Sequence, residues 1–481
     1  MNKIFLDFCD YSAEEIAEIT GGSVILGNSD RINSVSTDSR DVESGTLFVA
    51  IRGERFDGHD FIADVFGAGA SCALCERVPE GAQGLGGSLV VVKDTIAALG
   101  KLAKNYKSRI APWTVAVTGS VGKTTTKEFI YAVLNEKNKT HKTEGNFNNE
   151  IGLPLTVFSM EKDVKSAVLE LGMSFKGEIS RLSEIARPSV AVITNIGNSH
   201  IENLGSRENI CAAKLEILDG LEPDGYVILN ADEPLLFAQK GRLREKLLFV
   251  SMQNPAADFR ALNVRSYDDY TIYDLVLPGR VVTNIQIPTI GAHTVYDSAC
   301  AFVVGLLSSM TDEEIKRGLM KFKNTGMRQN IYSFGGITIV EDCYNAGPES
   351  MKASIDVLAK LSEKSGTKSV AVLGEMKELG EYSRQLHNDV GKAVAAKGIH
   401  RLCTFGKDAE NIALGAINHG FSHDRISINS DTEAPDATAI AIRAFISEGD
   451  VVLFKASRAV KLERVIESLK KLLEEKPLGK N

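Results

Sequence analysis

The chain has 481 residues, of which 43% are hydrophobic and 25% are charged, and its formal net charge is −8. At roughly 150 residues per domain this length predicts about three domains, each able to bury a core. The acidic balance, without a long basic run, argues against a nucleic-acid-binding surface, and no apolar run is long enough to predict a membrane span.

The N-terminal segment carries Asp7 and Asp10 and has no long apolar core, so we expect neither a signal peptide nor a transit peptide. Seven cysteines are scattered along the chain, an odd number that fits a reducing compartment, and we expect a cytoplasmic protein. Cys72 and Cys75 form a C-x-x-C pair, but their surroundings read as a strand and no second pair follows at zinc spacing. We interpret them as buried structural residues.

Three blocks of alternating strand and helix patterns follow one another, and we predict domains over 1–110, 111–325 and 326–481. In the first block the strands are SVILG, LFVAIRG, CALCE and SLVVVK. The second contains WTVAVT, SAVLELG and SVAVITNIG, each followed by helical sequence, and this alternation predicts a mostly parallel sheet covered by helices.

The third block has strands GITIVEDCY, SVAVLGEM, RLCTFG and VVLFKAS with helices between them. This pattern is Rossmann-like, but no strand is followed by G-x-G-x-x-G, so it does not predict a dinucleotide site. The predicted fold class is therefore α/β in three domains: an N-terminal α/β domain, a central P-loop ATPase-like parallel sheet and a C-terminal Rossmann-like domain.

Residues 118–128, TGSVGKTTTKE, lie between a predicted strand and a predicted helix, the context that a phosphate-binding P-loop requires. Backbone N–H groups of the turn would face the anion, Lys123 would add a positive charge, and the Thr124 hydroxyl could bind Mg²⁺. The general Walker pattern has four residues between its glycines, whereas here only two separate Gly119 from Gly122. The alternative is a glycine turn that caps a helix beside an incidental lysine.

Two further polar residues lie at strand ends of the second block. Glu170 ends the apolar strand AVLELG, where a carboxylate is costly unless it meets a cation; the alternative is that it reaches solvent. His200 follows the strand VAVITNIG, at the carboxyl edge of the predicted parallel sheet, where ligands usually bind.

Lys214 lies within the apolar stripe of a helix predicted over 206–221, with Ser206 as its cap. The stripe consists of Ile210, Ile217, Leu218 and Leu221. A lysine in such a stripe is desolvated, which lowers its pKa and leaves some neutral amine. The alternative is a lysine that extends along the edge of the stripe to reach water.

The short G-x-x-G-K-T loop resembles that of the Mur ligase family and its folylpolyglutamate synthase relatives. Segment 143–156, TEGNFNNEIGLPLT, resembles the MurF branch of the family, which joins D-Ala-D-Ala to UDP-MurNAc-tripeptide through an acyl phosphate. Further segments similar to this branch are STDSR (36–40), AIRGERFDGHDFI (50–62), LELGM (169–173), TNIGNSHIENLGSRENICAAKLEI (194–217), GAHTVYDSA (291–299), GMRQNIYSFGGITIVEDCYNAGPESM (326–351), VLGEMKELG (372–380) and FKASR (454–458).

The resemblance implies ATP, two Mg²⁺ ions and a lysine carbamate formed with CO₂ as cofactors. It implies catalytic roles for Lys123, His200 and Lys214. The implied metal ligands are Thr124, Glu170, His200 and Lys214 as the carbamate. The implied ATP-binding residues are Gly119, Ser120, Val121, Gly122, Lys123, Thr124, Thr125, His293, Asp297 and Arg328.

Substrate-binding residues follow from the same resemblance. The N-terminal domain would bind the UDP end of the substrate through Thr37, Asp38, Ser39 and Arg40. The asparagine-rich loop would contribute Asn146, Asn148 and Asn149. D-Ala-D-Ala would enter near Tyr344 and Asn345, and Lys455 and Arg458 would reach phosphate or a substrate carboxylate; the alternative for these two is a surface salt bridge.

The sequence departs from the family pattern at a few positions. Asp297 stands where the family has an asparagine that contacts adenine, and an aspartate can accept a hydrogen bond there but cannot donate one. Glu341 replaces the first residue of an Asp-Asp pair, Gly347 replaces an asparagine, and Ala456 replaces a glycine.

Two alternative functions stay open. One is the preceding ligase, which adds the third amino acid, or a folylpolyglutamate synthase; the other is a P-loop nucleotide-binding protein without ligase activity. We expect a monomer without nucleic-acid or membrane partners. The sequence leaves open whether the third peptide residue is lysine or diaminopimelate, and whether D-Ala-D-lactate can replace the dipeptide.

Overall fold

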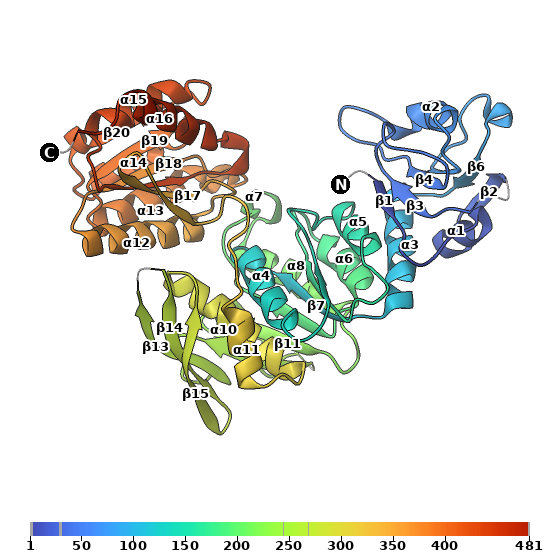
Figure 1. The fold of residues 1–481 in the computed structure, drawn as a ribbon, viewed down its shortest axis with the longest axis horizontal. Coiled ribbons are helices and arrows are strands. Elements are labelled where there is room, and N and C mark those ends of the chain that lie inside the picture. Colours follow the sequence, from blue (N-terminus) through green and yellow to red (C-terminus); the bar gives the residue numbers. More distant parts are fainter. Residues whose placement is uncertain (1–2, 28–30, 244, 268, 480–481) are drawn as a thin grey trace.

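The computed structural model describes residues 3–27, 31–243, 245–267 and 269–479. Figure 1 shows three α/β domains, with the N-terminal and C-terminal domains on either side of the central one. Each is built on one sheet, and the strands of the three sheets come from residues 3–91, 113–287 and 330–455. The α/β fold class in three domains is confirmed.

The N-terminal sheet has the order β1-β3-β4-β5-β6-β2, in which β3 to β6 are parallel and the two edge strands are antiparallel. Its strands are β1 (Lys3–Phe5), β2 (Ser23–Leu26), β3 (Ser34–Ser36), β4 (Thr46–Val49), β5 (Cys72–Cys75) and β6 (Ser88–Val91). Helices α1 (Ala13–Thr20) and α2 (Ile62–Gly67) belong to the same domain. Cys72 and Cys75 are both buried, as predicted.

Helix α3 (Thr95–Ile110) connects this domain to the central one. Asp94 caps its start by accepting a hydrogen bond from Ala97 N, and Ala111, the residue after the helix, has a left-handed φ of 51°. It packs on α1 of its own domain and on α5 and α6 of the central domain. The Tyr106 hydroxyl is buried and donates to the carbonyl of Met160, 3.0 Å away, which ties the two domains together.

The central sheet has the order β15-β14-β13-β12-β11-β10-β7-β9-β8. Strands β8 (Thr140–Lys142), β9 (Ser166–Glu170), β7 (Trp113–Thr118), β10 (Val190–Ile193), β11 (Tyr226–Asn230), β12 (Lys246–Ser251) and β13 (Phe259–Ser266) are parallel. Strands β14 (Thr271–Leu277) and β15 (Arg280–Ile287) extend the sheet by antiparallel pairing.

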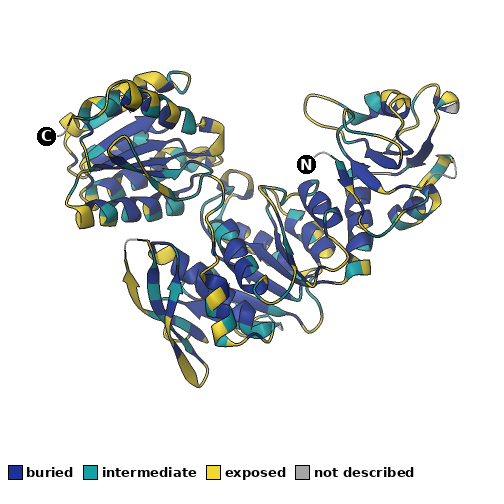
Figure 2. Cartoon of the chain, viewed as in Figure 1, coloured by how far each residue is buried: buried dark blue, intermediate teal, exposed yellow. Residues whose placement is uncertain are grey.

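Helices cover this sheet on both faces. Its buried residues belong to two hydrophobic clusters, one confined to the central domain and one that extends into the N-terminal and C-terminal domains. The helices are α4 (Lys123–Leu134), α5 (Gly152–Phe158), α6 (Glu178–Ala186), α7 (Ile201–Leu204), α8 (Arg207–Leu215), α9 (Pro234–Phe237), α10 (Ala292–Leu307) and α11 (Asp312–Leu319). Figure 2 shows that the inner strands of the sheets are buried, whereas exposed residues gather on loops, on the outer sides of helices and on parts of β13 and β15.

The C-terminal sheet has the order β16-β17-β21-β18-β19-β20, with only β16 antiparallel. Its strands are β16 (Asn330–Phe334), β17 (Ile337–Asp342), β18 (Ser369–Gly374), β19 (Arg401–Phe405), β20 (Ile426–Asn429) and β21 (Val451–Lys455). Its helices are α12 (Pro348–Ser365), α13 (Ser383–Ala396), α14 (Glu410–Asn418), α15 (Pro435–Phe445) and α16 (Glu463–Glu475). Within the described ranges, no helix has both the length and the apolar character that a membrane span needs.

Candidate active site

A cavity of about 830 Å³ lies between the central and C-terminal domains. Most of the residues predicted for ATP, metal and dipeptide binding line it. These are Ser120, Val121, Gly122, Lys123, Thr124, Thr125, Asn146, Asn148, Asn149, Glu170, His200, His293, Asp297, Arg328, Tyr344, Asn345 and Lys455. The lining does not include Gly119, Lys214, Arg458 or residues 37–40.

The predicted phosphate loop joins the end of β7 to the start of α4. Gly119 and Gly122 have φ angles of +152° and +85°, which favour glycine. A Cβ at position 119 would lie 1.9 Å from Thr194 Oγ1, so no side chain fits there. The Lys123 ammonium donates to Gly119 O at 2.7 Å and thus folds back over the turn. The strand, turn and helix around this loop are confirmed; its phosphate-binding role stays a prediction.

Glu170 lies inside the protein with 2% of its surface exposed, which excludes the alternative that it reaches solvent. Thr124 Oγ1 donates to one of its carboxylate oxygens at 2.8 Å, and Asn148 Nδ2 donates to the other at 2.9 Å. The backbone N–H of Glu170 donates to Thr143 Oγ1 at 3.0 Å. The asparagine-rich loop and the phosphate loop therefore meet at one buried carboxylate.

Lys214 is 1% exposed and lies on α8, whose N-terminus is capped by the predicted Ser206 hydroxyl. Burial lowers its pKa well below the usual value for lysine, and the nearby charge of Lys123 lowers it further. Among the ion pairs of the described residues none involves Lys214, so its amine is buried without a carboxylate partner.

His200 adopts a left-handed φ of 64° at the start of α7 and faces the C-terminal domain. Its Nδ1 lies 2.6 Å from Glu378 Oε2, close enough for an ion pair, although the alignment falls short of a directed hydrogen bond. This contact lowers the pKa of Glu378. Nearby, Asn198 Nδ2 donates to Glu349 Oε1 at 2.7 Å, so a second acidic residue of the C-terminal domain contacts the same loop.

Asp297 is buried on α10 against the phosphate loop. Thr126 Oγ1 donates to its Oδ1 at 2.7 Å, and a Cβ added at Gly122 would lie 3.0 Å from the same oxygen. Burial raises the pKa of Asp297 to about 7. His293 is exposed one turn earlier, and its Nε2 lies 3.0 Å from Gln329 Oε1.

The C-terminal side of the cavity carries an arginine and a buried ion pair. The Arg328 guanidinium lies over the Tyr344 ring, 3.9 Å from its centroid. Lys455 Nζ donates to Asp342 Oδ2 at 2.7 Å and to Asn345 O at 3.0 Å. Although burial opposes ionisation, the Lys455 charge and its hydrogen bond lower the pKa of Asp342.

Arg458 lies outside the cavity in an exposed ion pair with Glu463, at 2.5 Å, which is the alternative that the sequence left open. Lys455, by contrast, is buried and its ammonium already has a carboxylate partner. Their roles toward phosphate or substrate stay predictions.

The predicted UDP-binding residues, 37–40, follow β3 at the carboxyl edge of the N-terminal sheet, away from the cavity. Arg40 binds Asp38 through both carboxylate oxygens, with Nε–Oδ1 and Nη2–Oδ2 distances of 2.9 and 2.7 Å. This contact lowers the pKa of Asp38 to about 2.

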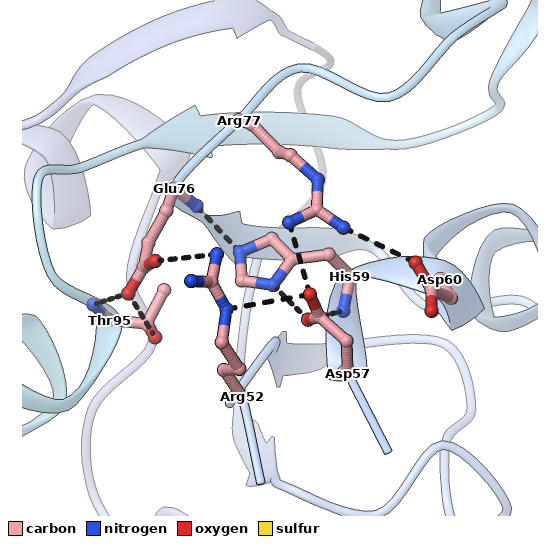
Figure 3. A network of polar contacts seen from close by, with 7 residues as sticks. All are labelled: Arg52, Asp57, His59, Asp60, Glu76, Arg77 and Thr95. Carbon is pink, nitrogen blue, oxygen red and sulfur yellow. Dashed lines mark hydrogen bonds and ion pairs between the residues drawn. The ribbon is translucent and has the colours of Figure 1, made fainter. Parts of the chain in front are cut away.

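A polar network that the sequence analysis missed lies at the same edge, after β4 and β5 (Figure 3). Its centre is the buried His59, whose Nδ1 lies 2.6 Å from Asp57 Oδ1 and whose Nε2 accepts a hydrogen bond from Glu76 N at 2.9 Å. Since Nε2 accepts, Nδ1 carries the proton and donates to Asp57. The His59 backbone N–H donates to the same carboxylate, and these contacts hold the pKa of Asp57 well below its usual range.

Two arginines of the network lie around Asp57 in Figure 3. Arg77 donates to Asp57 Oδ2 at 3.0 Å, and Arg52 Nε lies 3.6 Å from the same oxygen. The Glu76 carboxylate accepts from the N–H and hydroxyl of Thr95 at the start of α3, at 3.2 and 3.3 Å. The network thus ties the turn after β4 to β5 and to the helix that leads into the central domain.

Comparisons with known proteins agree with this architecture. Three family models match in succession: the Mur ligase family catalytic domain over residues 31–107, the Mur ligase middle domain over 117–305, and the Mur ligase glutamate ligase domain over 327–458. Together these cover most of the chain.

Two relatives that are similar to this chain over nearly its full length have the same name. UDP-N-acetylmuramoyl-tripeptide–D-alanyl-D-alanine ligase of Bacillus subtilis is 41% identical, covering 95% of this chain and 98% of its own. The Synechocystis protein of the same name is 34% identical, covering 97% and 96%.

Solved structures agree. MurF from Acinetobacter baumannii has a TM-score of 0.87 at 29% identity, covering 96% of this chain and 99% of its own. MurF from Thermotoga maritima in complex with ADP has a TM-score of 0.81 at 32% identity, covering 92% and 98%. A Mycobacterium tuberculosis folylpolyglutamate synthase, at 15% identity and a TM-score of 0.58, shares the fold alone. The family models and the full-length relatives show that the chain belongs to the Mur ligase family.

Proposed function

We propose that the protein is an ATP-dependent ligase that joins D-Ala-D-Ala to UDP-MurNAc-tripeptide, giving UDP-MurNAc-pentapeptide for peptidoglycan synthesis. The observation that carries this proposal is the cavity between two domains, where the phosphate loop, the buried Glu170 and Arg328 face one space. The names of the full-length relatives and the ADP complex of a MurF structure support it.

The reaction has two chemical steps. The terminal carboxylate of the tripeptide attacks the γ-phosphorus of ATP, so that an acyl phosphate forms and ADP leaves. The amine of D-Ala-D-Ala then attacks the acyl carbon, and the tetrahedral intermediate collapses to an amide as phosphate departs. Both steps bring several negative charges together, so stabilisation of that charge is the main task of the site.

In this proposal the N-terminus of α4 and Lys123 bind the ATP phosphates. The first turn of a helix presents N–H groups without intrahelical partners, and its dipole favours an anion. Counting from Gly122 within the described residues, the first N–H with a backbone acceptor is that of Thr126, which donates to Gly122 O. Lys123 has only to release Gly119 O to reach a phosphate.

The residues at Glu170 fit Mg²⁺. Thr124 Oγ1 and the Glu170 carboxylate are adjacent oxygen donors, the kind that Mg²⁺ prefers, and this ion commonly takes only one or two protein ligands besides phosphate oxygens and water. When bound, Mg²⁺ would neutralise phosphate charge; His200 is the proposed ligand of a second ion.

Lys214 fits a carbamate. Addition of CO₂ requires a neutral amine, and the burial of Lys214 beside Lys123 favours that form. The resulting carbamate would replace a buried amine without an acidic partner among the described residues by an anion able to bind Mg²⁺.

The substrates would reach the cavity from different domains. We place the UDP end of the tripeptide substrate at the carboxyl edge of the N-terminal sheet, near residues 37–40, and D-Ala-D-Ala near Tyr344 and Asn345. Closure of the C-terminal domain would bring Arg328 to the nucleotide and exclude water that would hydrolyse the acyl phosphate. We expect the enzyme to act as a monomer in the cytoplasm.

An omission assay tests the proposal. Phosphate release is measured with ATP, UDP-MurNAc-tripeptide and D-Ala-D-Ala, leaving out each in turn. We expect release only when all three are present. If phosphate release instead required UDP-MurNAc-dipeptide together with lysine or diaminopimelate, the enzyme would be the preceding ligase. Phosphate release that does not depend on D-Ala-D-Ala would reject the ligase assignment.

A further inference from the structure

The phosphate loop is held by hydrogen bonds to the segment that follows the neighbouring strand, β10. Strands β7 and β10 are parallel, with Thr118 opposite Ile193. Because both chains leave the sheet at the same edge, Thr194 and Asn195 run beside the turn that begins at Gly119. The turn is two residues shorter than the general Walker loop, so it has few groups with which to hold its own shape.

Asn195 occupies two N–H groups of this turn. Its Oδ1 accepts from Ser120 N at 3.1 Å and from Val121 N at 2.9 Å, and its backbone carbonyl also accepts from Ser120 N at 3.2 Å. The N–H groups left for an anion are therefore those that begin at Gly122, where the helix starts.

Thr194 binds the carbonyl group of the same residue, Val121. Its hydroxyl donates to Val121 O at 2.5 Å, and it closes the space beside Gly119 in which a side chain would otherwise lie. The N–H and the carbonyl of Val121 are thus both fixed by adjacent residues of one neighbouring segment. Asn230 Nδ2 in turn donates to Thr194 O at 3.0 Å, which anchors that segment to β11.

We propose that Asn195 and Thr194 are positioning residues for ATP, which hold the short loop so that the N–H groups of Gly122 to Thr125 and the Lys123 ammonium converge on the phosphates. Asn195 stays bound to Ser120 and Val121 when the nucleotide enters. The proposal rests on the proposed binding of ATP at this loop.

The chemistry of Asn195 suits this position. Its amide oxygen is neutral, so it satisfies two N–H donors beside an anion site without adding negative charge. A carboxylate in the same place would satisfy the same donors but repel the phosphates. If the Asn195 amide oxygen instead took the position of a phosphate oxygen, it would compete with ATP, and its removal would tighten ATP binding.

Direct binding of Mg-ADP, measured by calorimetry and by the rise in Tm that it produces, tests the proposal without the ligase reaction. We expect Asn195→Ala to weaken binding by about tenfold, since Val121 N loses its acceptor and Ser120 N keeps only the backbone carbonyl of residue 195. Asn195→Asp should weaken it too, despite its retained acceptor, and more so at low salt.

Two conservative substitutions of Thr194 distinguish the contribution of its hydroxyl hydrogen bond from that of its side-chain shape. Thr194→Val should weaken Mg-ADP binding several-fold, whereas Thr194→Ser, which keeps the hydroxyl, should bind as the unaltered protein does. The matched control is Thr114→Val: Thr114 is equally buried at the other end of β7, and its hydroxyl donates to Pro112 O at 2.8 Å. In turnover, the variants should raise KM for ATP and leave KM for D-Ala-D-Ala unchanged.

Unchanged or tighter binding of Mg-ADP by Asn195→Ala would overturn the proposal. So would equal weakening by Thr194→Val, Thr194→Ser and Thr114→Val, which would indicate general destabilisation. If the unaltered protein bound Mg-ADP but formed no amide, the proposed function would fail while the positioning role stood.

Discussion

Lys214 places an amine in the interior of the central domain with no carboxylate beside it among the described ion pairs, and its pKa is lowered by burial and by Lys123. We expect Lys214→Ala to lower kcat at least about 100-fold, since the proposed carbamate cannot form. Added bicarbonate should not restore the activity of this variant. The measurement is phosphate release with all three substrates, together with a ¹³C-bicarbonate NMR spectrum of the protein.

Lys107 provides the matched control for this prediction. It is also buried, on α3, and burial lowers its pKa to about 8, but it lies outside the cavity. Lys107→Ala should retain both turnover and the carbamate signal. Near-normal activity in Lys214→Ala, or a carbamate signal that persists in it, would contradict the carbamate proposal.

The raised pKa of Asp297 leads us to expect that the stability of the fold depends on pH. This pKa is raised to about 7 by burial, whereas an aspartate in the unfolded chain titrates near 4, so the folded state binds the proton more tightly. Stability therefore falls as the pH rises from about 4 to about 7, by up to about 4 kcal/mol. Asp297→Asn removes this loss, and its gain in Tm over the unaltered protein, without nucleotide, should be larger at pH 8 than at pH 5. An equal gain at both values would show that Asp297 is not a buried acid of raised pKa.

At the level of residues, the sequence predicted the site residues that can be recognised from their chemistry or from the local pattern around them. Gly119, Gly122 and Lys123 stand in a strand–turn–helix context, and the burial of Glu170 follows from its apolar strand. Asn195 could not be found in this way, because its partners at positions 120 and 121 depend on the pairing of β10 with β7, which is a property of the sheet and not of the local sequence.

Helices and strands show where local pattern stops being sufficient. The helix predicted over 206–221 ends at Leu215 and continues as a 3₁₀ turn over Glu216–Leu218. The reason is tertiary: both Glu216 carboxylate oxygens accept from Gly177 N, at 2.9 and 2.8 Å, just before the start of α6. The antiparallel pair β14 and β15 was not predicted. Alternate residues of β14 are buried in the structure, but its sequence TIYDLVL has apolar residues at both alternating sets of positions, so no polar–apolar alternation marks it as a strand.

The polar network around His59 lies at the carboxyl edge of the N-terminal sheet. His59 binds Asp57, which in turn contacts Arg52 and Arg77, at the same edge of the sheet as the proposed UDP-binding residues. We expect His59→Ala to raise KM for UDP-MurNAc-tripeptide about tenfold, because Asp57 loses its buried donor and the turn loses its support. KM for ATP and for D-Ala-D-Ala should not change.

Two variants make this test specific. His59→Asn can still donate to Asp57 and should recover part of the affinity. His387 is an equally buried histidine in the C-terminal domain, whose Nε2 accepts from Met376 N at 3.0 Å; His387→Ala controls for the loss of a buried imidazole. An equal rise in KM for the tripeptide substrate in both alanine variants would refute the local role of His59.

At the scale of the whole molecule, acidic residues of the C-terminal domain contact the loop after β10 in the central domain. Glu378 lies 2.6 Å from His200, Glu349 accepts from Asn198 at 2.7 Å, and the Tyr382 hydroxyl donates to Gly205 O at 3.3 Å. The three blocks of the sequence predicted the separate domains. They did not predict this contact, because it depends on how the central and C-terminal domains meet.

Glu378→Ala removes one cross-domain ion pair, so the C-terminal domain should spend less time against the central domain. Because closure excludes water from the acyl phosphate, we expect more phosphate released per amide formed, together with a larger radius of gyration by small-angle X-ray scattering. Asp356→Ala is the control, since Asp356 forms an exposed pair with Lys397 at 2.8 Å within the C-terminal domain. A phosphate-to-amide ratio that stays at one in Glu378→Ala, with unchanged scattering, would mean that the His200–Glu378 contact does not govern closure, and the protection of the acyl phosphate would then depend on the Glu349 and Tyr382 contacts or on the substrates themselves.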